Sequence, residues 1–381
     1  MPDLKSVVTW SAVAAGVAIA AERRLSRSLK DPDAPLLDWE LVRRTAYSRA
    51  GAAGAAEVEG AAGDYDPLVQ ELVPWLAEAC HTRPGEASFG RVRVIDRHAF
   101  VDQNLAMMRR LLRPVEERRD GWNAFRPSPL MRVPASLYVG TLLGFMARRV
   151  LGQYDPVLSF PSAEGEPVEL PEPALLIVEP NVRQFSERSE LPLGSLRRWL
   201  MLHELTHAWQ FENHPWLRPH LVSIVQELSQ MPGAGARLGL GELVQVARRL
   251  GPQLSLVGRL QAVMSVLEGH GNFVMREAGR RHLPDFETLD RAFHRRHEEP
   301  DPAERLLLWI SGVALKLRQY QQGERFLRRI SEVGGQPALD RVWMGAEDMP
   351  GWSEVRRPEL WLRRLGYLPP LGSGTPSPQP A

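Results

Sequence analysis

His203-Glu204-Leu205-Thr206-His207 is the stretch of sequence from which the rest of the chain can be interpreted. It lies inside Ser195 to Phe211, a segment whose apolar spacing predicts a helix. Residues four apart on a helix stand side by side on one face, so the two imidazoles can bind one cation together. Glu204 lies about 100° around the helix from His203, close enough to reach a metal-bound water without being a ligand. The motif therefore predicts a metal site.

This arrangement matches the division of labour that hydrolysis requires. Two nitrogens hold Zn²⁺, the ion lowers the pKa of a bound water toward about 7, and the Glu204 carboxylate takes the proton and later passes it to a leaving amine. In a chain of this composition the pattern is expected by chance about 0.03 times. The alternative is a pair of solvent-facing histidines on an ordinary helix. The motif indicates a metal more firmly than it indicates a substrate.

A catalytic zinc site needs a third protein ligand and an open coordination position. The metzincin pattern would place a glycine and a histidine where this chain has Gln210 and Asn213, so that subclass is disfavoured. We favour Glu268 as the third ligand, because it follows apolar residues in a helical segment, where an unpaired carboxylate would be costly. His270 is the alternative, either as the third ligand or as a donor to the transition state.

Other polar residues are weaker candidates. Asn272 comes four residues after Glu268 and could orient it, or could make an ordinary helix hydrogen bond. Tyr320 could stabilise an oxyanion, or could lie on a solvated helix face. His214 and His220 are interpreted as parts of a packed loop. The remaining histidines lie in charged or polar surroundings and are predicted at the surface: His81, His98, His282, His294 and His297.

The composition excludes several classes of protein. The chain has 381 residues, of which 44% are hydrophobic, which allows a sizeable core in one large domain or in two or three. With 47 Lys+Arg against 46 Asp+Glu and no strongly basic block, a nucleic-acid partner is not expected. A single cysteine, Cys80, excludes an intramolecular disulfide and a multi-cysteine metal site. Any metal must be held by histidine and carboxylates.

Helical periodicity dominates the chain. Ala174 to Val178 is the clearest strand, and Phe160 to Pro173 is expected to form a surface loop or hairpin arm. Gly140 and Gly144 share one helix face, where another backbone could approach closely. The predicted helices are Asp38 to Arg49, Asp66 to Ala79, Phe100 to Leu112, Ser136 to Leu151, Pro192 to Phe211, Gly241 to Leu250, Leu254 to Gly279 and Pro302 to Ile330.

The ends of the chain are expected to differ from its body. The apolar segment Val7 to Ala21 has about 15 residues, fewer than the roughly 20 needed to span a bilayer, so a membrane partner is not expected. Ala18-Ile19-Ala20 has the form of a signal-peptide cleavage site, but Asp3 weakens the positive charge before it. We expect a cytoplasmic protein, with export as the alternative. Peripheral attachment through the apolar segment is a further possibility.

Blocks of sequence distributed along the chain are similar to a family of zincin-like metal-dependent hydrolases from high-GC bacteria. Some members of this family are linked with biosynthesis of the deazaflavin coenzyme, a link that says little about chemistry. The blocks are Asp38-Trp39-Glu40-Leu41, Gly140 to Phe145, Val150 to Asp155, Val178-Glu179-Pro180-Asn181, His203 to Phe211, Pro215-Trp216-Leu217, Leu267 to His270 through Val274-Met275, and Arg318 to Phe326.

The resemblance implies an α+β, predominantly helical fold of the zincin-like metalloprotease type, with a small sheet beside the active-site helix. It also implies a gluzincin-like zinc site of His203, His207 and Glu268. Where the family pattern has an acid after the Val-Met pair, this chain has Arg276. The implied organisation is one domain over 38–368, with a helical half at 38–170 and a metal-site half at 171–368. A helical extension at 1–37 precedes it, and a disordered tail at 369–381 follows it.

We therefore expect a zinc-dependent metallohydrolase, a peptidase, that acts on a peptide or another carbonyl substrate with Glu204 as general base. The alternative is a non-catalytic helical protein that binds zinc or a ligand and whose HExxH site is structural or inactive. The coordination number separates the two. Three protein ligands facing an open position favour the enzyme, whereas a fourth ligand such as His270 favours the structural site.

Overall fold

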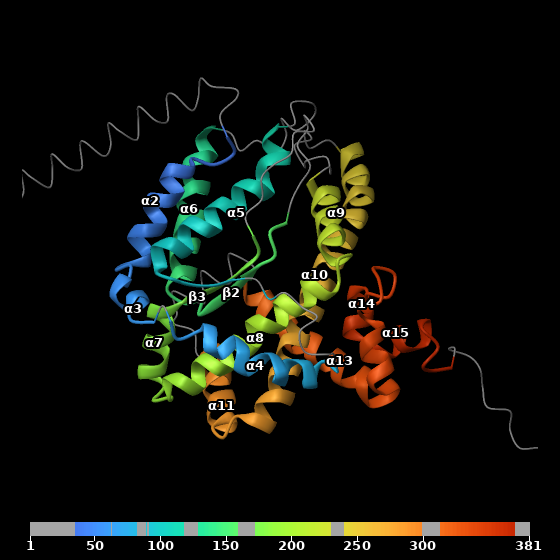
Figure 1. The fold of residues 1–381 in the computed structure, drawn as a ribbon. Coiled ribbons are helices and arrows are strands. Elements are labelled where there is room, and N and C mark those ends of the chain that lie inside the picture. The colour runs from blue at the N-terminus through green and yellow to red at the C-terminus, as the bar shows by residue number, and fades with distance from the viewer. Residues whose placement is uncertain are drawn as a thin grey trace, which may run out of the picture.

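The computed structural model describes residues 35–61, 63–81, 89, 91–117, 129–158, 172–229, 240–298 and 313–369. Helices dominate these ranges (Figure 1). The helices are α2 Trp39–Ala50, α3 Ala55–Glu59, α4 Asp66–Ala79, α5 Arg97–Glu117, α6 Pro129–Ala147, α7 Glu179–Arg188, α8 Leu193–Asn213, α9 Leu217–Ser229, α10 Leu240–His282, α11 Phe286–Glu298, α13 Val313–Arg341, α14 Trp352–Arg356 and α15 Pro358–Arg364. The strands are β1 Arg91–Ile95, β2 Gly152–Asp155 and β3 Ala174–Val178.

A small sheet divides the hydrophobic core into two parts. β3 is its central strand, parallel to β1 and antiparallel to β2. All five residues of β3 are buried, as a continuous apolar run between two covered faces requires. Leu175 and Ile177 face the larger cluster, and Leu176 and Val178 face the smaller one. The strand predicted at Ala174 to Val178 is confirmed.

The smaller cluster lies between the sheet and the helices α2, α5 and α6 (Figure 1). α2 begins at an N-cap, where the Asp38 carboxylate accepts a hydrogen bond from the backbone N–H of Leu41 at 2.9 Å. A Cβ at Gly140 would lie 2.6 Å from the carbonyl oxygen of Val42, and one at Gly144 would overlap the backbone of α2. The close backbone approach predicted for these two glycines is therefore present.

The larger cluster surrounds α8. This helix packs against the sheet, α4, α7 and α10, and it buries residues on every side, as expected for a central helix. α10 in turn crosses α13 where Gly269 meets Gly323. A Cβ at Gly323 would overlap the backbone carbonyl of Ser265, so only glycine permits this crossing. The result is a layer of long helices that holds α8 and α10 side by side.

Several boundaries differ from the sequence-based prediction. β1 and β2 were not predicted as strands, because each is short and half polar and gains its hydrogen bonds only by pairing with β3. The alternation of arginine and valine in β1 is a period-two signal that could have identified it. The helix predicted to Leu151 ends at Ala147, which leaves Gly152 to begin β2.

α10 is a single helix of 43 residues, although two helices were predicted on either side of Gly251 and Pro252. An interior proline costs roughly 3 kcal/mol, and the packing of α10 on α8, α9 and α13 offsets that cost. α13 runs on to Arg341, beyond the predicted end at Ile330, through a kink at Gly335. None of the helices in the described ranges combines the length and apolar character that a membrane span requires.

Some predictions concern residues that the structure does not describe. The apolar segment Val7 to Ala21 and most of the expected N-terminal extension are among them. So are nearly all of the loop predicted at 160–173, the first part of the helix predicted from Pro302, and the tail beyond 369.

Candidate metal centre

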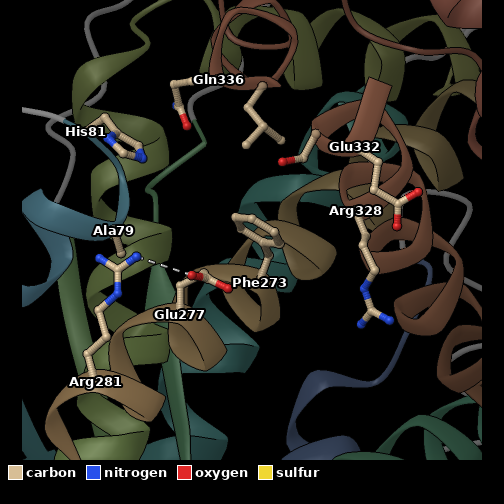
Figure 2. Close-up of a pocket in the computed structure, with 10 residues that line it drawn as sticks. Ala79, His81, Phe273, Glu277, Arg281, Arg328, Glu332 and Gln336 are labelled. Carbon is tan, nitrogen blue, oxygen red and sulfur yellow. Dashed lines mark hydrogen bonds and ion pairs between the residues drawn. The ribbon is translucent and has the colours of Figure 1, made fainter. Parts of the chain in front are cut away.

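A surface cavity of about 350 Å³ lies between the end of α4, α10 and α13 (Figure 2). Phe273 lines this cavity, and the charged side chains around the cavity already have partners within the protein. Arg281 pairs with Glu277 at 3.5 Å, and Arg328 pairs with Glu324 at 2.7 Å. Glu332 pairs with an arginine on α13 at 3.2 Å. No residue of the His-Glu motif lines this cavity, so the candidate site lies elsewhere.

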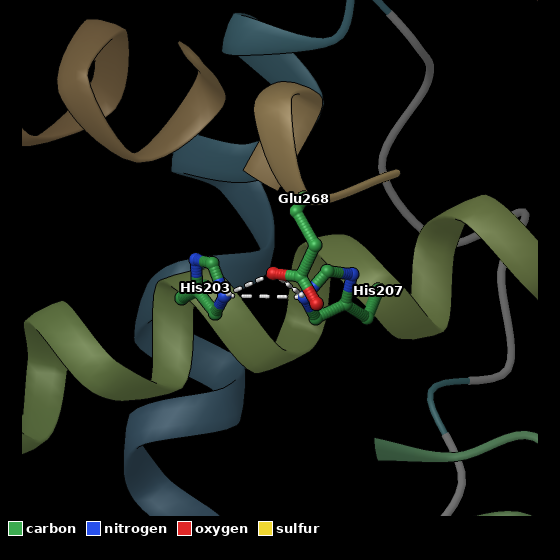
Figure 3. Close-up of side chains that lie close together, drawn as sticks. All are labelled: His203, His207 and Glu268. Carbon is green, nitrogen blue, oxygen red and sulfur yellow. Dashed lines mark hydrogen bonds and ion pairs between the residues drawn. The ribbon is translucent and has the colours of Figure 1, made fainter. Parts of the chain in front are cut away.

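Three predicted ligands converge between α8 and α10 (Figure 3). His203 and His207 stand one turn apart on α8, with their Nε2 atoms 3.1 Å apart. The Oε2 atom of Glu268, on α10, lies 3.6 Å from each of these nitrogens. One ligand atom from each residue lies within 4.8 Å of the others. The structure thus brings together the three residues predicted as ligands from the sequence.

A glycine allows α10 to reach the imidazoles. Gly271 follows Glu268 by one helical turn and faces the same neighbour. A Cβ at Gly271 would lie 3.0 Å from Cε1 of His203 and 3.4 Å from Cε1 of His207. A methyl group at this position would require the imidazoles or the Glu268 turn to shift by a few tenths of an ångström. Sequence reasoning did not identify Gly271, because the need for it arises only from the contact between two distant segments.

The charges of the cluster favour a cation. Burial lowers the pKa of His207, but the charge of Glu268 and a hydrogen bond with it outweigh this and raise the pKa to about 9. Burial raises the pKa of Glu268, but His207 and His203 outweigh this, and the pKa is well below its usual value. A carboxylate beside two imidazole nitrogens thus binds a positive charge even when that charge is a proton.

The spacing of the donors fits one small metal ion. Zinc bonds to nitrogen and oxygen are about 2.0–2.2 Å long, so a tetrahedral site separates neighbouring donors by about 3.3 Å. The observed separations are 3.1 Å between the two imidazole nitrogens and 3.6 Å from each to Glu268. Shifts of a few tenths of an ångström would satisfy all three bonds. Two imidazoles and one carboxylate are also a donor set that suits zinc.

Glu204 lies beside the ligand cluster and under the edge of the sheet. Its side chain is buried, at 4% exposure, and burial is the main cause that raises its pKa, with a further contribution from the charge of Glu268. The carboxylate accepts a hydrogen bond from the backbone N–H of Tyr154 on β2. A Cβ at Gly152 would lie 2.8 Å from Oε1 of Glu204. β2 therefore accommodates this carboxylate and helps to hold it.

His270 points away from the ligand cluster, as its spacing from Glu268 predicts for a regular helix. It is buried, and its Nδ1 lies 3.1 Å from Nε2 of Gln210. The ring stacks on Trp209 at 5.3 Å between centroids and meets the edge of Trp343 at 4.8 Å. Burial lowers the pKa of His270 to about 3, so this ring is neutral. The ligand cluster in the described part of the chain does not include it.

The two weaker candidates lie on the same helices. Asn272 is partly buried on α10, and within the described residues no hydrogen bond joins it to Glu268. Tyr320 belongs to α13, but its side chain lies outside the described part of the structure. Asn272 therefore gains no contact to Glu268 in this part of the chain, and the role of Tyr320 stays a prediction.

The other histidines serve packing or the surface. His214 ends α8, where its Nδ1 lies 2.8 Å from the carbonyl oxygen of Gln210, and His220 packs edge-on to Trp216. His214 thus agrees with the predicted packed loop, whereas His220 lies within α9, because the helix resumes at Leu217. His81 is exposed, whereas His98 stacks on Tyr47 and His282 stacks on Trp75 while pairing with Glu78; both are half-buried. The side chains of His294 and His297 lie outside the description.

Gln210 is a site residue that sequence reasoning missed. It was considered only as a departure from the metzincin pattern, yet its side chain is fully buried at 0% exposure. Its Oε1 lies 3.0 Å from Nδ1 of His207, and its Nε2 lies 2.9 Å from the carbonyl oxygen of Leu267. The available signal was its position, three residues after His207 and thus one turn along the same face.

Comparison with known proteins gives matches that include the ligand cluster. The zincin-like metallopeptidase family matches residues 37–362. Among solved structures, a chain from Chloroflexus aurantiacus described as "a putative hydrolase with a novel fold" is similar, with 30% sequence identity and a TM-score of 0.62. The match covers 87% of this chain and 99% of that one. No curated protein matches. Neither similarity concerns the deazaflavin coenzyme.

Proposed function

The chain belongs to the zincin-like metallopeptidase family, and from this premise we propose that it is a zinc-dependent peptidase. The family suggests a metal-dependent hydrolase, and the identity of the ion and the substrate are the further steps of the proposal. One observation carries it. Two imidazole nitrogens and a carboxylate oxygen converge between α8 and α10, beside a buried second carboxylate.

His203, His207 and Glu268 are proposed to hold the ion. Their donor atoms and their spacing suit zinc, and three protein ligands leave a position for substrate. When bound, zinc acts as a Lewis acid that polarises a carbonyl group and acidifies a water molecule. Gly271 serves this site by letting the Glu268 turn lie against the two rings.

Glu204 is proposed as the general base. Its raised pKa makes it a better proton acceptor near neutral pH than an exposed glutamate. The carboxylate would take a proton from the attacking water and pass it to the leaving amine. The hydrogen bond from the Tyr154 backbone restricts the orientation of the carboxylate before substrate arrives.

The substrate is proposed to be a peptide. β2 is an edge strand of the described sheet, and its backbone already contacts Glu204. A substrate that binds in an extended conformation along such an edge can place a scissile carbonyl beside the carboxylate. We expect this reaction to occur in the cytoplasm.

Metal analysis tests the proposal. The wild-type chain should contain or take up about one zinc, and His203→Ala should take up none. His98→Ala is the matched control, since His98 stacks on Tyr47 outside the cluster and its loss should leave the zinc in place. Glu204→Gln should keep the zinc and lose hydrolysis of a peptide library. A wild-type chain that binds no zinc would contradict the proposal.

A further inference from the structure

We propose that Gln210 is a positioning residue that sets the orientation of His207 and ties it to the turn of α10 that carries Glu268. The inference rests on the proposed function, because it concerns how the ligands of the metal are held. It assigns a role to a residue that touches neither the ion nor the substrate. The support is a chain of hydrogen bonds whose directions can be worked out from the donors and acceptors available.

The argument starts at the backbone of α10. The carbonyl oxygen of Leu267 can only accept a hydrogen bond, so the Gln210 atom 2.9 Å from it must be the NH₂ group. The other end of the amide, Oε1, therefore faces Nδ1 of His207 at 3.0 Å. Because Oε1 can only accept, Nδ1 of His207 must carry a proton. The structure itself thus fixes the amide orientation of Gln210.

The consequence for His207 concerns its other nitrogen. A ring held with its proton on Nδ1 presents Nε2 as the atom available to a metal ion. That nitrogen is the one that lies 3.1 Å from His203 and 3.6 Å from Glu268. The bond to Gln210 also fixes the rotation of the ring, so Nε2 points into the cluster before any ion is bound.

The second proton of the amide reaches His270. Nε2 of Gln210 lies 3.1 Å from Nδ1 of this ring, which must accept and therefore carries its own proton on Nε2. The amide oxygen of Gln210 and both protons of its NH₂ group therefore have partners within the protein, and the side chain is fully buried. Since Leu267 and His270 flank Glu268, the amide connects the imidazole of α8 to the turn that supplies the third ligand.

The loss of this contact has a predictable size. Removing the outer partner of a metal-binding histidine reduces metal affinity by about 10- to 100-fold in other proteins. Gln210→Met keeps the length and volume of the side chain but leaves His207 without an acceptor and removes the side-chain donor to the carbonyl of Leu267. Gln210→Glu keeps an acceptor for His207 and loses only the donors to α10.

The test measures zinc affinity by competition with a chelating dye, together with the nitrogen-bound protons of ¹⁵N-labelled histidines by NMR. Gln210→Met should bind zinc about 10- to 100-fold more weakly than wild type. Gln210→Glu should bind more tightly than Gln210→Met. In the metal-free chain the Nδ1 proton of His207, identified by its loss in His207→Ala, should be protected from exchange in wild type and in Gln210→Glu. It should not be protected in Gln210→Met.

The control is Gln336→Met, which removes a partly exposed glutamine that donates to Asp340 on α13 at 2.7 Å. Its zinc affinity should equal that of wild type. Unchanged zinc affinity in a folded Gln210→Met, or an unprotected Nδ1 proton in wild type, would overturn the inference and leave the proposed function standing. If Gln210→Met does not fold, the NMR comparison of wild type with Gln210→Glu decides. Zinc binding without hydrolysis would contradict the proposed function alone.

Discussion

The two sides of the sheet bury very different groups. The side covered by α2, α5 and α6 is almost entirely apolar, and its buried polar side chains bond to backbone groups, as Asn104 does to Phe100 and Ser136 to Arg132 and Asp38. The side that holds α8 buries the charged or strongly polar groups Glu179, Arg197, Glu204, Gln210 and His270. The apolar side supports the sheet, and the other side contains the candidate metal site.

Buried charge on the α8 side is itself of two kinds. Glu179 is satisfied within the protein, since it accepts from Tyr65 at 2.6 Å and from Arg183 at 2.9 Å and also pairs with Arg197. Among the residues that the structure describes, Glu268 has only the two imidazole nitrogens of the cluster as charged or polar partners, each 3.6 Å away. The first kind already has its partners within the protein, whereas the second could bind a cation. This difference marks the candidate metal site more clearly than burial alone.

The largest loss of stability is expected when Glu179, whose charge is paired within the protein, is removed. Glu179→Leu should lower the free energy of unfolding by about 3–5 kcal/mol, because it leaves Arg197 buried without its main partner. Glu71→Leu is the matched control: Glu71 pairs at 2.8 Å with Arg198, the next residue of α8, in a more exposed setting, and should cost about 0–1 kcal/mol. Urea denaturation measures both. Equal losses in the two variants would contradict the claim that the buried Glu179–Arg197 pair stabilises the fold more than the more exposed Glu71–Arg198 pair.

Zinc should stabilise the fold by binding at Glu268, the buried carboxylate that lies beside the two imidazoles. At a free zinc concentration of 100 times Kd, the free energy of unfolding should rise by about 2.7 kcal/mol, because the folded chain presents the three donors together. Glu268→Gln should lose this gain. His98→Ala should retain it, and so should Glu179→Leu if that variant folds. Thermal unfolding with and without zinc gives the comparison, and an equal gain in Glu268→Gln would show that the ion binds elsewhere.

Crowding the apolar side should change stability without changing the site. In Gly144→Ala the new Cβ would overlap the backbone of α2, and overpacking of this kind costs about 1–3 kcal/mol. Zinc affinity should stay at the wild-type value, since α2 and α6 supply no residue to the cluster. Gly258→Ala is the control, because its Cβ would lie 3.5 Å from Trp352, an ordinary contact. A parallel loss of zinc affinity in Gly144→Ala would show that the two sides are coupled.

The smallest effect is the change in zinc affinity expected for each unit of pH. His207 has a pKa of about 9 in the metal-free chain, so below that pH zinc must displace its proton. Zinc affinity should therefore rise as the pH rises from 6 to 8, by about tenfold per unit, which equals about 1.4 kcal/mol. Above a pH of about 9 this contribution should level off. A zinc affinity that is independent of pH from 6 to 8 would contradict the assignment of His207 as a ligand.

The sequence predicted the parts of the molecule that local pattern controls. The helix around His203 and His207, the strand at Ala174–Val178 and the close approach at Gly140 and Gly144 all follow from spacing along one segment. For the third position the sequence favours Glu268, because of the apolar residues before it, and leaves His270 as the alternative. The choice between them depends on which face of α10 meets α8.

The missed features all depend on contacts between distant segments. Gln210 gains its importance from Leu267 and His270, which come about 60 residues later in the chain. Gly271 and Gly152 matter because imidazoles and a carboxylate of α8 occupy the space beside them. β2 forms only because β3 supplies its partner. Periodicity within one segment carries no information about such neighbours.

The most direct measurement is anomalous X-ray diffraction at the zinc edge from crystals of the zinc-loaded wild-type chain. The proposed site predicts one strong peak per chain, about 2.0–2.2 Å from Nε2 of His203, Nε2 of His207 and a carboxylate oxygen of Glu268. His270 should remain stacked on Trp209 and outside the coordination sphere. A peak that includes His270 as a ligand, a peak at another place, or no peak at all would contradict the proposal.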